Sequence, residues 1–357
     1  MKQGWEYKKF EACINKTPKP KQVKTEEYNS GTKYPIVSQE DKLISGYYDD
    51  ESYVFHIDSP VVIFGDHTRV LKYVDFDFVV GADGVKIISP KQELNAKFLL
   101  YYLQWYKIPN LGYSRHYKLL KELNIPLPPK STQLAIVFEL DKINELIRLK
   151  KEQLKDFDNL AQSIFYEMFG DPVENEMGWE VKRISNIAKY HNGVAHEKDV
   201  DKDGEFILVN AKFISSEGKI RKKTNIQHFP LFRNDVVMVL SDLPNGKSLA
   251  KCFLIDEDKK YSLNQRICCF RGFEGSAIFL KYVINRNPYL LLFDNGKSQT
   301  NLRKGDVEKM PIPLPPLPLQ HLFAQRIEQI EHQKAEVQKA IADLETLLAS
   351  RMQYWFE

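Results

Sequence analysis

Two stretches of the chain share an apolar pattern in which steps of four and three residues alternate. In 136–168 and in 323–355, most positions of this seam hold Ile, Leu, Val, Phe or Met. A heptad pattern of this kind is typical of a helix that packs against a second helix carrying the same pattern. Each helix would be about 60 Å long at its rise of 1.5 Å per residue. The pattern therefore predicts two helical struts.

Each predicted helix follows the same short motif. Ile-Pro-Leu-Pro-Pro stands at 125–129 and again at 312–316, and the motif is followed by Gln133 in the first copy and Gln320 in the second. Because proline cannot continue a helix interior, each helix is expected to begin directly after its Pro-Pro pair. Gly170, which precedes an Asp-Pro step, is expected to end the first helix.

A second repeat divides the whole chain into two halves. "GWEYKK" at 4–9 is echoed by "GWEVKR" at 178–183, and "FLLYYL" at 98–103 is echoed by "FLKYVI" at 279–284. Each half therefore runs from Gly-Trp-Glu through a globular region to the proline motif and a long helix. If the helices pack on each other, we expect an antiparallel coiled coil with a globular body at each end.

The globular regions carry mixed signals of secondary structure. Two longer apolar segments, 91–106 and 274–288, predict short helices. Shorter apolar runs between turn residues predict strands. The predicted strands lie within 34–38, 52–57, 60–65, 76–88, 206–210, 235–240, 250–255 and 265–270.

These elements define the expected fold class. It is α/β, of the mixed α+β kind, with two pseudo-repeated globular domains joined by two long helices that form an antiparallel coiled coil. The expected segments are a first globular domain (1–125), a central repeat helix (126–170), a linker with a second globular domain (171–311) and a distal repeat helix (312–357).

Composition places the chain among globular proteins. It has 357 residues, of which 43% are hydrophobic and 28% charged. No apolar run reaches the roughly 20 residues that span a bilayer, and the first residues lack the apolar core of a signal peptide. We therefore expect a cytoplasmic protein with no membrane association. The four cysteines lack metal-binding spacing and are expected to be buried thiols.

Positive charge gathers in the globular regions. Residues 1–125 and 179–311 carry net charges of +2 and +7, whereas the helical segments 126–178 and 312–357 carry −4 and −2. Clusters of Lys and Arg on both globular regions favour an anionic partner, with solvated surface charge as the alternative.

The chain shows no recognisable catalytic constellation. Two Asn-Gly-Lys-Ser segments are similar to the end of a phosphate-binding loop, but Ser241 and Leu291 stand where that loop needs Gly. His191 and His196, near two aspartates, are a metal candidate that is better explained as scattered side chains. We therefore expect no catalytic residue, metal or cofactor in this chain.

The order of the repeats resembles the DNA specificity subunit of type I restriction-modification systems. The resemblance covers essentially the whole chain and is carried by the two proline motifs with their Gln, the two Gly-Trp-Glu motifs and "SLNQR" at 262–266. The Glu that usually precedes the Gln is replaced here by Thr132 and Leu319. The resemblance implies two target recognition domains, each reading one half of a bipartite sequence in double-stranded DNA. Because the loops of the two halves differ in sequence, the target is expected to be asymmetric.

The resemblance also implies partners. The helices would set the distance between half-sites and dock two methyltransferase (modification) subunits, and restriction/translocase subunits would join for cleavage. S-adenosylmethionine, ATP and Mg would then be bound by those subunits. Two alternatives remain open: the recognition subunit of a bifunctional restriction enzyme that cuts on both sides of its site, and a coiled-coil adaptor that does not bind DNA.

Candidate DNA-binding residues follow from the chemistry of readout. Arg, Lys, Asn, Gln and Ser contact base edges, while Lys and Arg also hold phosphates. For each candidate the alternative is a solvated or strand-capping side chain. The candidates are Ser38, Gln39, Lys42, His67, Arg69, Arg115 and His116 in the first domain and Asn210, Lys212, Arg221, Lys222, Lys223, Asn245, Lys247, Gln265 and Arg303 in the second.

Overall fold

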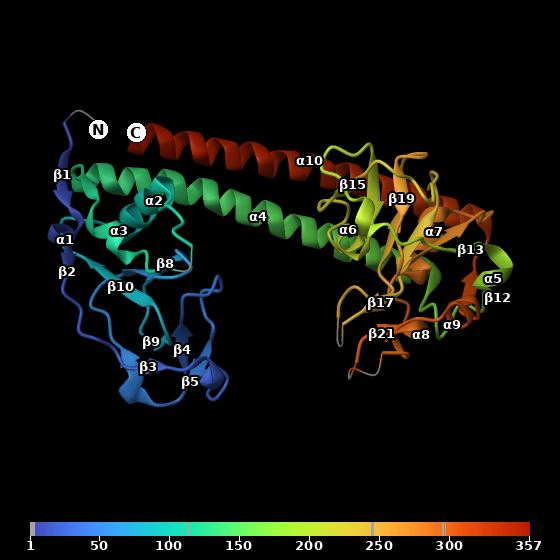
Figure 1. Cartoon of the computed structure of the whole chain (residues 1–357), viewed down its shortest axis with the longest axis horizontal. Coiled ribbons are helices and arrows are strands. Elements are labelled where there is room, and N and C mark those ends of the chain that lie inside the picture. The colour runs from blue at the N-terminus through green and yellow to red at the C-terminus, as the bar shows by residue number, and fades with distance from the viewer. Residues whose placement is uncertain (1–3, 113, 244–245, 295, 297) are drawn as a thin grey trace. The chain divides into compact units, whose positions relative to one another are not determined.

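The chain forms two compact units. In the computed structural model, which describes residues 4–112, 114–243, 246–294, 296 and 298–357, unit 1 comprises Met1–Glu152 with Gln338–Glu357, and unit 2 comprises Gln153–Val337 (Figure 1). The unit boundaries thus fall inside the two long helices, so each unit contains part of both. The predicted segments, by contrast, treated each helix as a separate piece.

The two long helices are present as predicted. α4 spans Lys130–Phe169 and α10 spans Leu317–Phe356, and each has 40 residues. Both begin directly after a Pro-Pro pair. α4 ends where the backbone of Gly170 turns to a φ of +73° and its N–H donates to the carbonyl of Tyr166 over 2.9 Å. This is the left-handed helix cap that glycine favours.

Within each unit the two helices lie side by side and antiparallel (Figure 1). In unit 1, Glu139 of α4 accepts hydrogen bonds from Arg351 and from the Trp355 indole of α10, and the hydrogen bond from Arg351 lowers the pKa of Glu139. In unit 2, Lys334 of α10 pairs with Asp158 of α4 over 2.7 Å. Lys334 and Arg351 are polar residues within the apolar seam, and both are satisfied by the facing helix.

Unit 1 is built on two sheets and a two-stranded ribbon. The sheets have the strand orders β2-β10-β7-β8 and β3-β9-β4-β5, with β6 also on β9, and the ribbon is β1-β11. The strands are β1 (Glu6–Lys9), β2 (Ile14–Asn15), β3 (Gln22–Val23), β4 (Tyr34–Val37), β5 (Gly46–Tyr48), β6 (Val54–Phe55), β7 (Val61–Gly65), β8 (Leu71–Val74), β9 (Phe78–Gly81), β10 (Val85–Pro90) and β11 (Asn124–Leu127), and the helices are α1 (Phe10–Cys13), α2 (Ala96–Tyr106) and α3 (Tyr117–Lys121).

Unit 2 repeats this plan. Its sheet β13-β20-β16-β18 has the order of β2-β10-β7-β8, and its β14 pairs in parallel with β19 as β4 does with β9. The strands are β12 (Glu180–Arg183), β13 (Lys189–Asn192), β14 (Phe206–Val209), β15 (Lys222–Thr224), β16 (Val236–Val239), β17 (Ser241–Asp242), β18 (Cys252–Leu254), β19 (Tyr261–Leu263), β20 (Ile267–Arg271), β21 (Thr300–Asn301) and β22 (Pro311–Leu314), and the helices are α5 (Ile184–Ile187), α6 (Ala211–Ser215), α7 (Ala277–Ile284), α8 (Pro288–Leu291) and α9 (Lys304–Glu308).

The two repeated motifs are strand partners. β1, from the first Gly-Trp-Glu, pairs antiparallel with β11, so that Tyr7 faces Pro126. β12, from the second, pairs in the same way with β22, so that Val181 faces Pro313. Each ribbon has only two strands, and proline is tolerated at such an edge because one side of the strand needs no donor. The pairing explains why each motif occurs once per half.

The repeated glutamine ties the start of each long helix to the domain beside it. The Gln133 side chain is buried; its Oε1 accepts from the N–H of Asn95 over 2.8 Å, and its Nε2 donates to the carbonyls of Glu93 and Pro128 at 2.9 Å each. Asn95 in turn caps the N-terminus of α2. The glutamine therefore satisfies three backbone groups at a buried junction.

Gln320 makes the same junction in unit 2. Its Oε1 accepts from the N–H of Ser276 over 3.1 Å, and its Nε2 donates to the Pro315 carbonyl over 2.8 Å. Ser276 caps the N-terminus of α7, which corresponds to α2. The glutamine is thus a structural element of the repeat.

Replacing Gln133 with Ala is expected to lower the free energy of unfolding by about 3 kcal/mol, because it leaves buried backbone donors and acceptors without partners. Urea unfolding followed by circular dichroism measures the loss. Gln338→Ala, at an exposed position of α10, is the matched control and should change stability by less than about 0.5 kcal/mol. Equal stabilities for the two variants would contradict the role assigned to Gln133.

The hydrophobic cores of the two units are completed by equivalent contacts. In unit 1, Phe356 at the end of α10 packs against Phe98 of α2, with ring centroids 5.5 Å apart. In unit 2, Phe169 at the end of α4 packs against Phe279 of α7 at 5.0 Å. Each unit therefore completes its core with the end of the helix that begins in the other half of the sequence.

The cysteines and the helices have the expected general character. All four cysteines are buried and free, as predicted. Among the described residues, none of the helices has the length and apolar character needed to cross a bilayer.

Candidate nucleic-acid interface

The candidate residues of unit 1 lie at one end of its strands. Ser38 and Gln39 follow β4, His67 and Arg69 form the turn from β7 to β8, and the turn from β9 to β10 includes Gly84. Backbone hydrogen bonds join the turns: the N–H of Asp66 donates to the Gly84 carbonyl over 2.7 Å. Candidates from separate parts of the sequence are thereby brought together.

Gln39 occupies the centre of this edge. Its carbonyl accepts from the Thr68 hydroxyl over 2.8 Å, and its Oε1 faces the N–H of His67 at 3.4 Å. Gly84 lies so close that a Cβ there would be 2.9 Å from both the Gln39 Oε1 and the His67 ring. Glycine is required at this position because the side chains occupy the space a Cβ would fill.

The buried side chain of His116 joins the turn after β7 to the loop after α2. Its side chain is completely buried; Nδ1 donates to the Asp66 carbonyl over 2.9 Å, and Nε2 accepts from the N–H of Leu111 over 3.0 Å. Both ring nitrogens are therefore used within the chain. Contact with DNA was expected for His116, but its burial assigns it to positioning the loop. The adjacent Arg115 is exposed.

Ser38 is a second candidate that the structure buries. Only 1% of it is exposed, and its hydroxyl lies 2.6 Å from that of Ser45 while accepting from the N–H of Glu40 over 3.1 Å. Ser38 thus closes the loop that carries Gln39. Lys42, in the same loop, is exposed, and Arg69 donates from its guanidinium to the Ile108 carbonyl over 3.0 Å.

The corresponding edge of unit 2 holds several candidates of the second domain. Asn210 follows β14, as Ser38 follows β4, and its Oδ1 caps α6 by accepting from the N–H of Phe213 over 2.9 Å. The turn from β19 to β20 lies alongside, because the N–H of Asn264 donates to the Val209 carbonyl over 3.1 Å. That turn presents the exposed side chain of Gln265.

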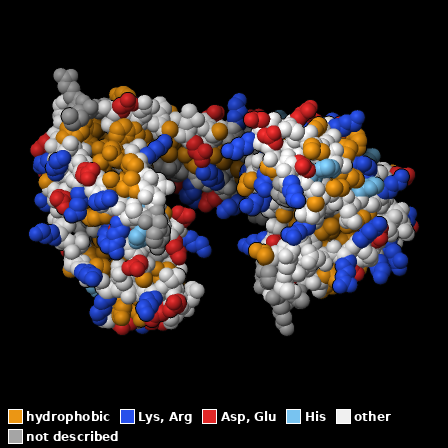
Figure 2. All heavy atoms as spheres, viewed as in Figure 1, with side chains coloured by type: hydrophobic (Ala, Val, Ile, Leu, Met, Phe, Trp, Pro, Cys, Tyr) orange, Lys and Arg blue, Asp and Glu red, His pale blue; other side chains and the backbone are white. Residues whose placement is uncertain are grey.

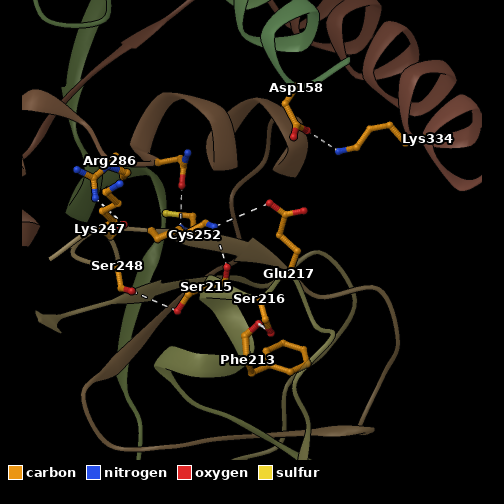
Figure 3. A network of polar contacts seen from close by, with 12 residues as sticks. Asp158, Phe213, Ser215, Ser216, Glu217, Lys247, Ser248, Cys252, Arg286 and Lys334 are labelled. Atoms are coloured by element: carbon orange, nitrogen blue, oxygen red, sulfur yellow. Dashed lines mark hydrogen bonds and ion pairs between the residues drawn. The ribbon is translucent and has the colours of Figure 1, made fainter. Parts of the chain in front are cut away.

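Lys247 lies in a loop that is anchored at several points (Figure 3). Arg286 donates to its carbonyl over 2.6 Å, and the hydroxyl of the next residue, Ser248, bonds to that of Ser215 in α6 over 3.2 Å. The Lys247 side chain is exposed. The loop is therefore fixed through its main chain and Ser248 while the lysine faces solvent. Asn245, also a candidate, lies outside the described residues.

Arg221, Lys222 and Lys223 lie at and along β15, an edge strand, and all three are exposed. Arg221 also donates from Nε to the Gly218 carbonyl over 2.7 Å. Lys212 and Arg303 are exposed as well. Figure 2 shows Lys and Arg side chains spread over the visible face of unit 2, with fewer Asp and Glu among them.

The edges offer hydrogen-bond donors and positive charge. Among the described residues, no three His, Cys, Asp or Glu side chains are grouped to hold a metal ion. His191 and His196 were considered for such a site; burial lowers the pKa of His191, and His196 Nδ1 bonds to the Val194 carbonyl over 2.7 Å. Exposed Lys, Arg and Gln side chains on fixed loops suit the base edges and phosphates of DNA.

One buried lysine at this edge was not among the candidate residues. Lys72 lies in the apolar stretch of β8 and is only 6% exposed. Its ammonium donates to the carbonyl of Ser38 over 2.8 Å and to that of Lys42. The signal in the sequence was a single lysine on the same face of the strand as the apolar Val74, which is buried.

Comparisons with known proteins cover nearly all of the chain. The family model of the type I restriction modification DNA specificity domain matches residues 2–156 and 176–346. The MjaIX specificity subunit of a type I restriction enzyme from Methanocaldococcus jannaschii is 34% identical over 89 residues, which cover 21% of each chain. The EcoR124I/EcoR124II specificity subunit from Escherichia coli is 25% identical over 191 residues, 50% of this chain and 46% of that one. The chain thus matches less than half the length of these relatives.

Two solved structures share the fold. The S subunit of a type I restriction-modification system from M. genitalium superposes with a TM-score of 0.56 at 14% identity, covering 99% of this chain and 96% of that one. A structure described as the basis of complex assembly and conformational transition of the type I restriction-modification system gives a TM-score of 0.57 at 17% identity, covering 100% of this chain and 98% of that one.

Proposed function

The chain belongs to the family of type I restriction-modification DNA specificity subunits, and from that membership we propose that it reads an asymmetric bipartite sequence in double-stranded DNA. Specificity subunits are the non-catalytic members of these systems. In this proposal unit 1 contacts one half-site and unit 2 the other. The proposal is supported chiefly by the edge that occurs in both units. There, loops at corresponding ends of equivalent strands present Lys, Arg and Gln side chains.

We further propose that the long helices dock two methyltransferase subunits, with restriction/translocase subunits joining for cleavage. Exposed apolar side chains on the helices support this part. Leu134 and Phe138 of α4 are 51% and 66% exposed, and Leu317 and Leu322 of α10 are 49% and 41% exposed. Large apolar side chains that are exposed on a helix are suited to burial in an interface with another protein. S-adenosylmethionine, ATP and Mg belong to these partners in the proposal.

Replacing residues 1–124 with the matching segment of another family member is expected to change one half-site and leave the other and the gap intact. The reason is that each unit has its own strands and loops, and the junction falls immediately before the repeated Ile-Pro-Leu-Pro-Pro. Methylome sequencing of a host carrying the hybrid measures both halves at once. Changes in both halves would contradict independent reading by the two units.

A further inference from the structure

The loop between β4 and β5 of unit 1 is held by a buried lysine. Lys72 reaches from β8 so that its ammonium donates to the carbonyls of Ser38 and Lys42, at the start and middle of the loop. Within the described part of the chain, none of the carboxylates forms an ion pair with Lys72. Loop 38–45 therefore wraps a charged group that has been removed from water.

Burial of this ammonium is costly to the fold. Removing a charge from water without an ion-pair partner disfavours the charged form. Burial accordingly lowers the pKa of Lys72, and the charges of Glu40 and Asp41 in the same loop oppose that shift. A buried lysine at this position makes the fold less stable than an apolar residue would. We therefore infer that Lys72 is there to hold this loop.

Unit 2 shows that the scaffold does not need a lysine there. β18 occupies the place of β8, and Phe253 on β18 faces Val237 as Lys72 faces Ile63. Phe253 packs against Phe213 of α6, the element that follows β14, with ring centroids 4.9 Å apart. In unit 2 an aromatic pair stands at the position of Lys72, and Lys251, just before β18, donates to the Ser215 carbonyl over 3.1 Å while pairing with Glu217. Unit 1 differs in that its lysine is buried and has no ion-pair partner among the described residues.

The loop held by Lys72 presents the amide of Gln39. The main chain is fixed by the Thr68 hydroxyl, and the Oε1 faces the His67 N–H at 3.4 Å. The absence of a side chain at Gly65 lets the loop approach, because a Cβ there would lie 2.9 Å from the Cβ of Gln39. Among the described residues, no acceptor bonds to the Gln39 Nε2, and the side chain is half-buried.

We propose that Gln39 reads an adenine in the half-site of unit 1, and that Lys72 is the positioning residue that presets its amide. A glutamine amide matches adenine in the major groove, since Nε2 donates to N7 while Oε1 accepts from N6. Fixing the loop before binding avoids the cost of ordering it on DNA. This inference rests on the proposed DNA-reading function.

The test compares base preferences of variants. The chain, assembled with its methyltransferase subunits, selects from duplexes with randomised half-sites, and sequencing gives the preference at each position. Gln39→Ala is expected to lose preference for one A·T pair by about 5- to 150-fold. Lys72→Met should weaken the same position, and adding it to Gln39→Ala should cause no further loss there. The other half-site should be unaffected.

The controls separate positioning from general damage. Lys33→Met removes an exposed charge at the opposite end of β4 and should change nothing. Thr68→Val, at an exposed turn position, releases the Gln39 carbonyl and the N–H of Val70, which bonds to the Thr68 hydroxyl over 3.3 Å. It should give a smaller loss at the same base pair, and it replaces Lys72→Met in the test if that variant does not fold. Loss of preference for G·C, or equal losses at all positions, would overturn the inference. Failure of the unaltered complex to select any sequence would overturn the proposed function itself.

Discussion

Inserting two residues into both long helices is expected to abolish binding to the target, whereas inserting four should keep both half-sites and lengthen the gap between them. The insertions go after Glu152 in α4 and after Val337 in α10, where the boundaries of the compact units fall. Two residues turn the following side chains by about 200°, which takes the apolar seams out of register. Four residues add roughly 6 Å and come close to one full turn.

The expected shift can be measured in base pairs. DNA rises about 3.4 Å per base pair, so an added 6 Å corresponds to one or two base pairs of gap. Methylome sequencing of hosts carrying each variant gives the gap directly. As a control, Ala replaces two exposed residues beside each insertion point without lengthening the helices, and the gap should then stay unchanged. Methylation at the original spacing after the four-residue insertion would show that the helices do not set the distance.

Replacing Arg221, Lys222 and Lys223 together with Gln is expected to weaken DNA binding by about 500-fold at 0.1 M salt if all three hold phosphates. Each phosphate contact contributes about 0.9 to the slope of log affinity against log salt, so the slope should fall by about 2.7. Phosphates carry no base identity, and the selected sequence should therefore stay the same. Fluorescence anisotropy over a salt series measures both the affinity and the slope.

A matched triple substitution tests whether position matters or only charge. Lys182, Arg183 and Lys189 are exposed at the opposite end of the β20 sheet and its neighbouring ribbon. Their replacement with Gln removes the same number and type of charges and should leave the slope nearly unchanged. If the two triples reduce the slope equally, the run on β15 is only solvated surface.

Local and periodic features of the fold could be predicted from the sequence. The bounds of α4 and α10 followed from the apolar seam together with Pro-Pro and Gly170, because prolines and glycine act on the backbone directly. Strands such as β7 and β16 were evident as short apolar runs. The pairing of β1 with β11 was not predicted, although both motifs had been identified, because periodicity carries no information about which distant strands pair.

The candidate site was predicted less completely for a related reason. Gln39, Arg115 and Lys247 were chosen by residue type, and the structure places Gln39 and Lys247 on loops that follow strands and Arg115 just before α3. His116 was also chosen by residue type, but tertiary packing buries its side chain. No local pattern in the sequence reveals that burial. Lys72 was missed because a lysine in a short strand is normally exposed. Whether Lys72 is buried depends on the loop that folds over its side chain, and the sequence of that loop has no regular apolar pattern.

We expect this chain to select the DNA sequence at which its partners act. Methylome sequencing of the host with and without the gene tests it most directly. We predict adenine methylation at one bipartite motif with two unlike halves and a fixed gap. The methylation should be present with the gene, lost without it, and restored by the gene on a plasmid. An unchanged set of methylated sites after deletion, in a host whose methyltransferase subunits are expressed, would contradict it.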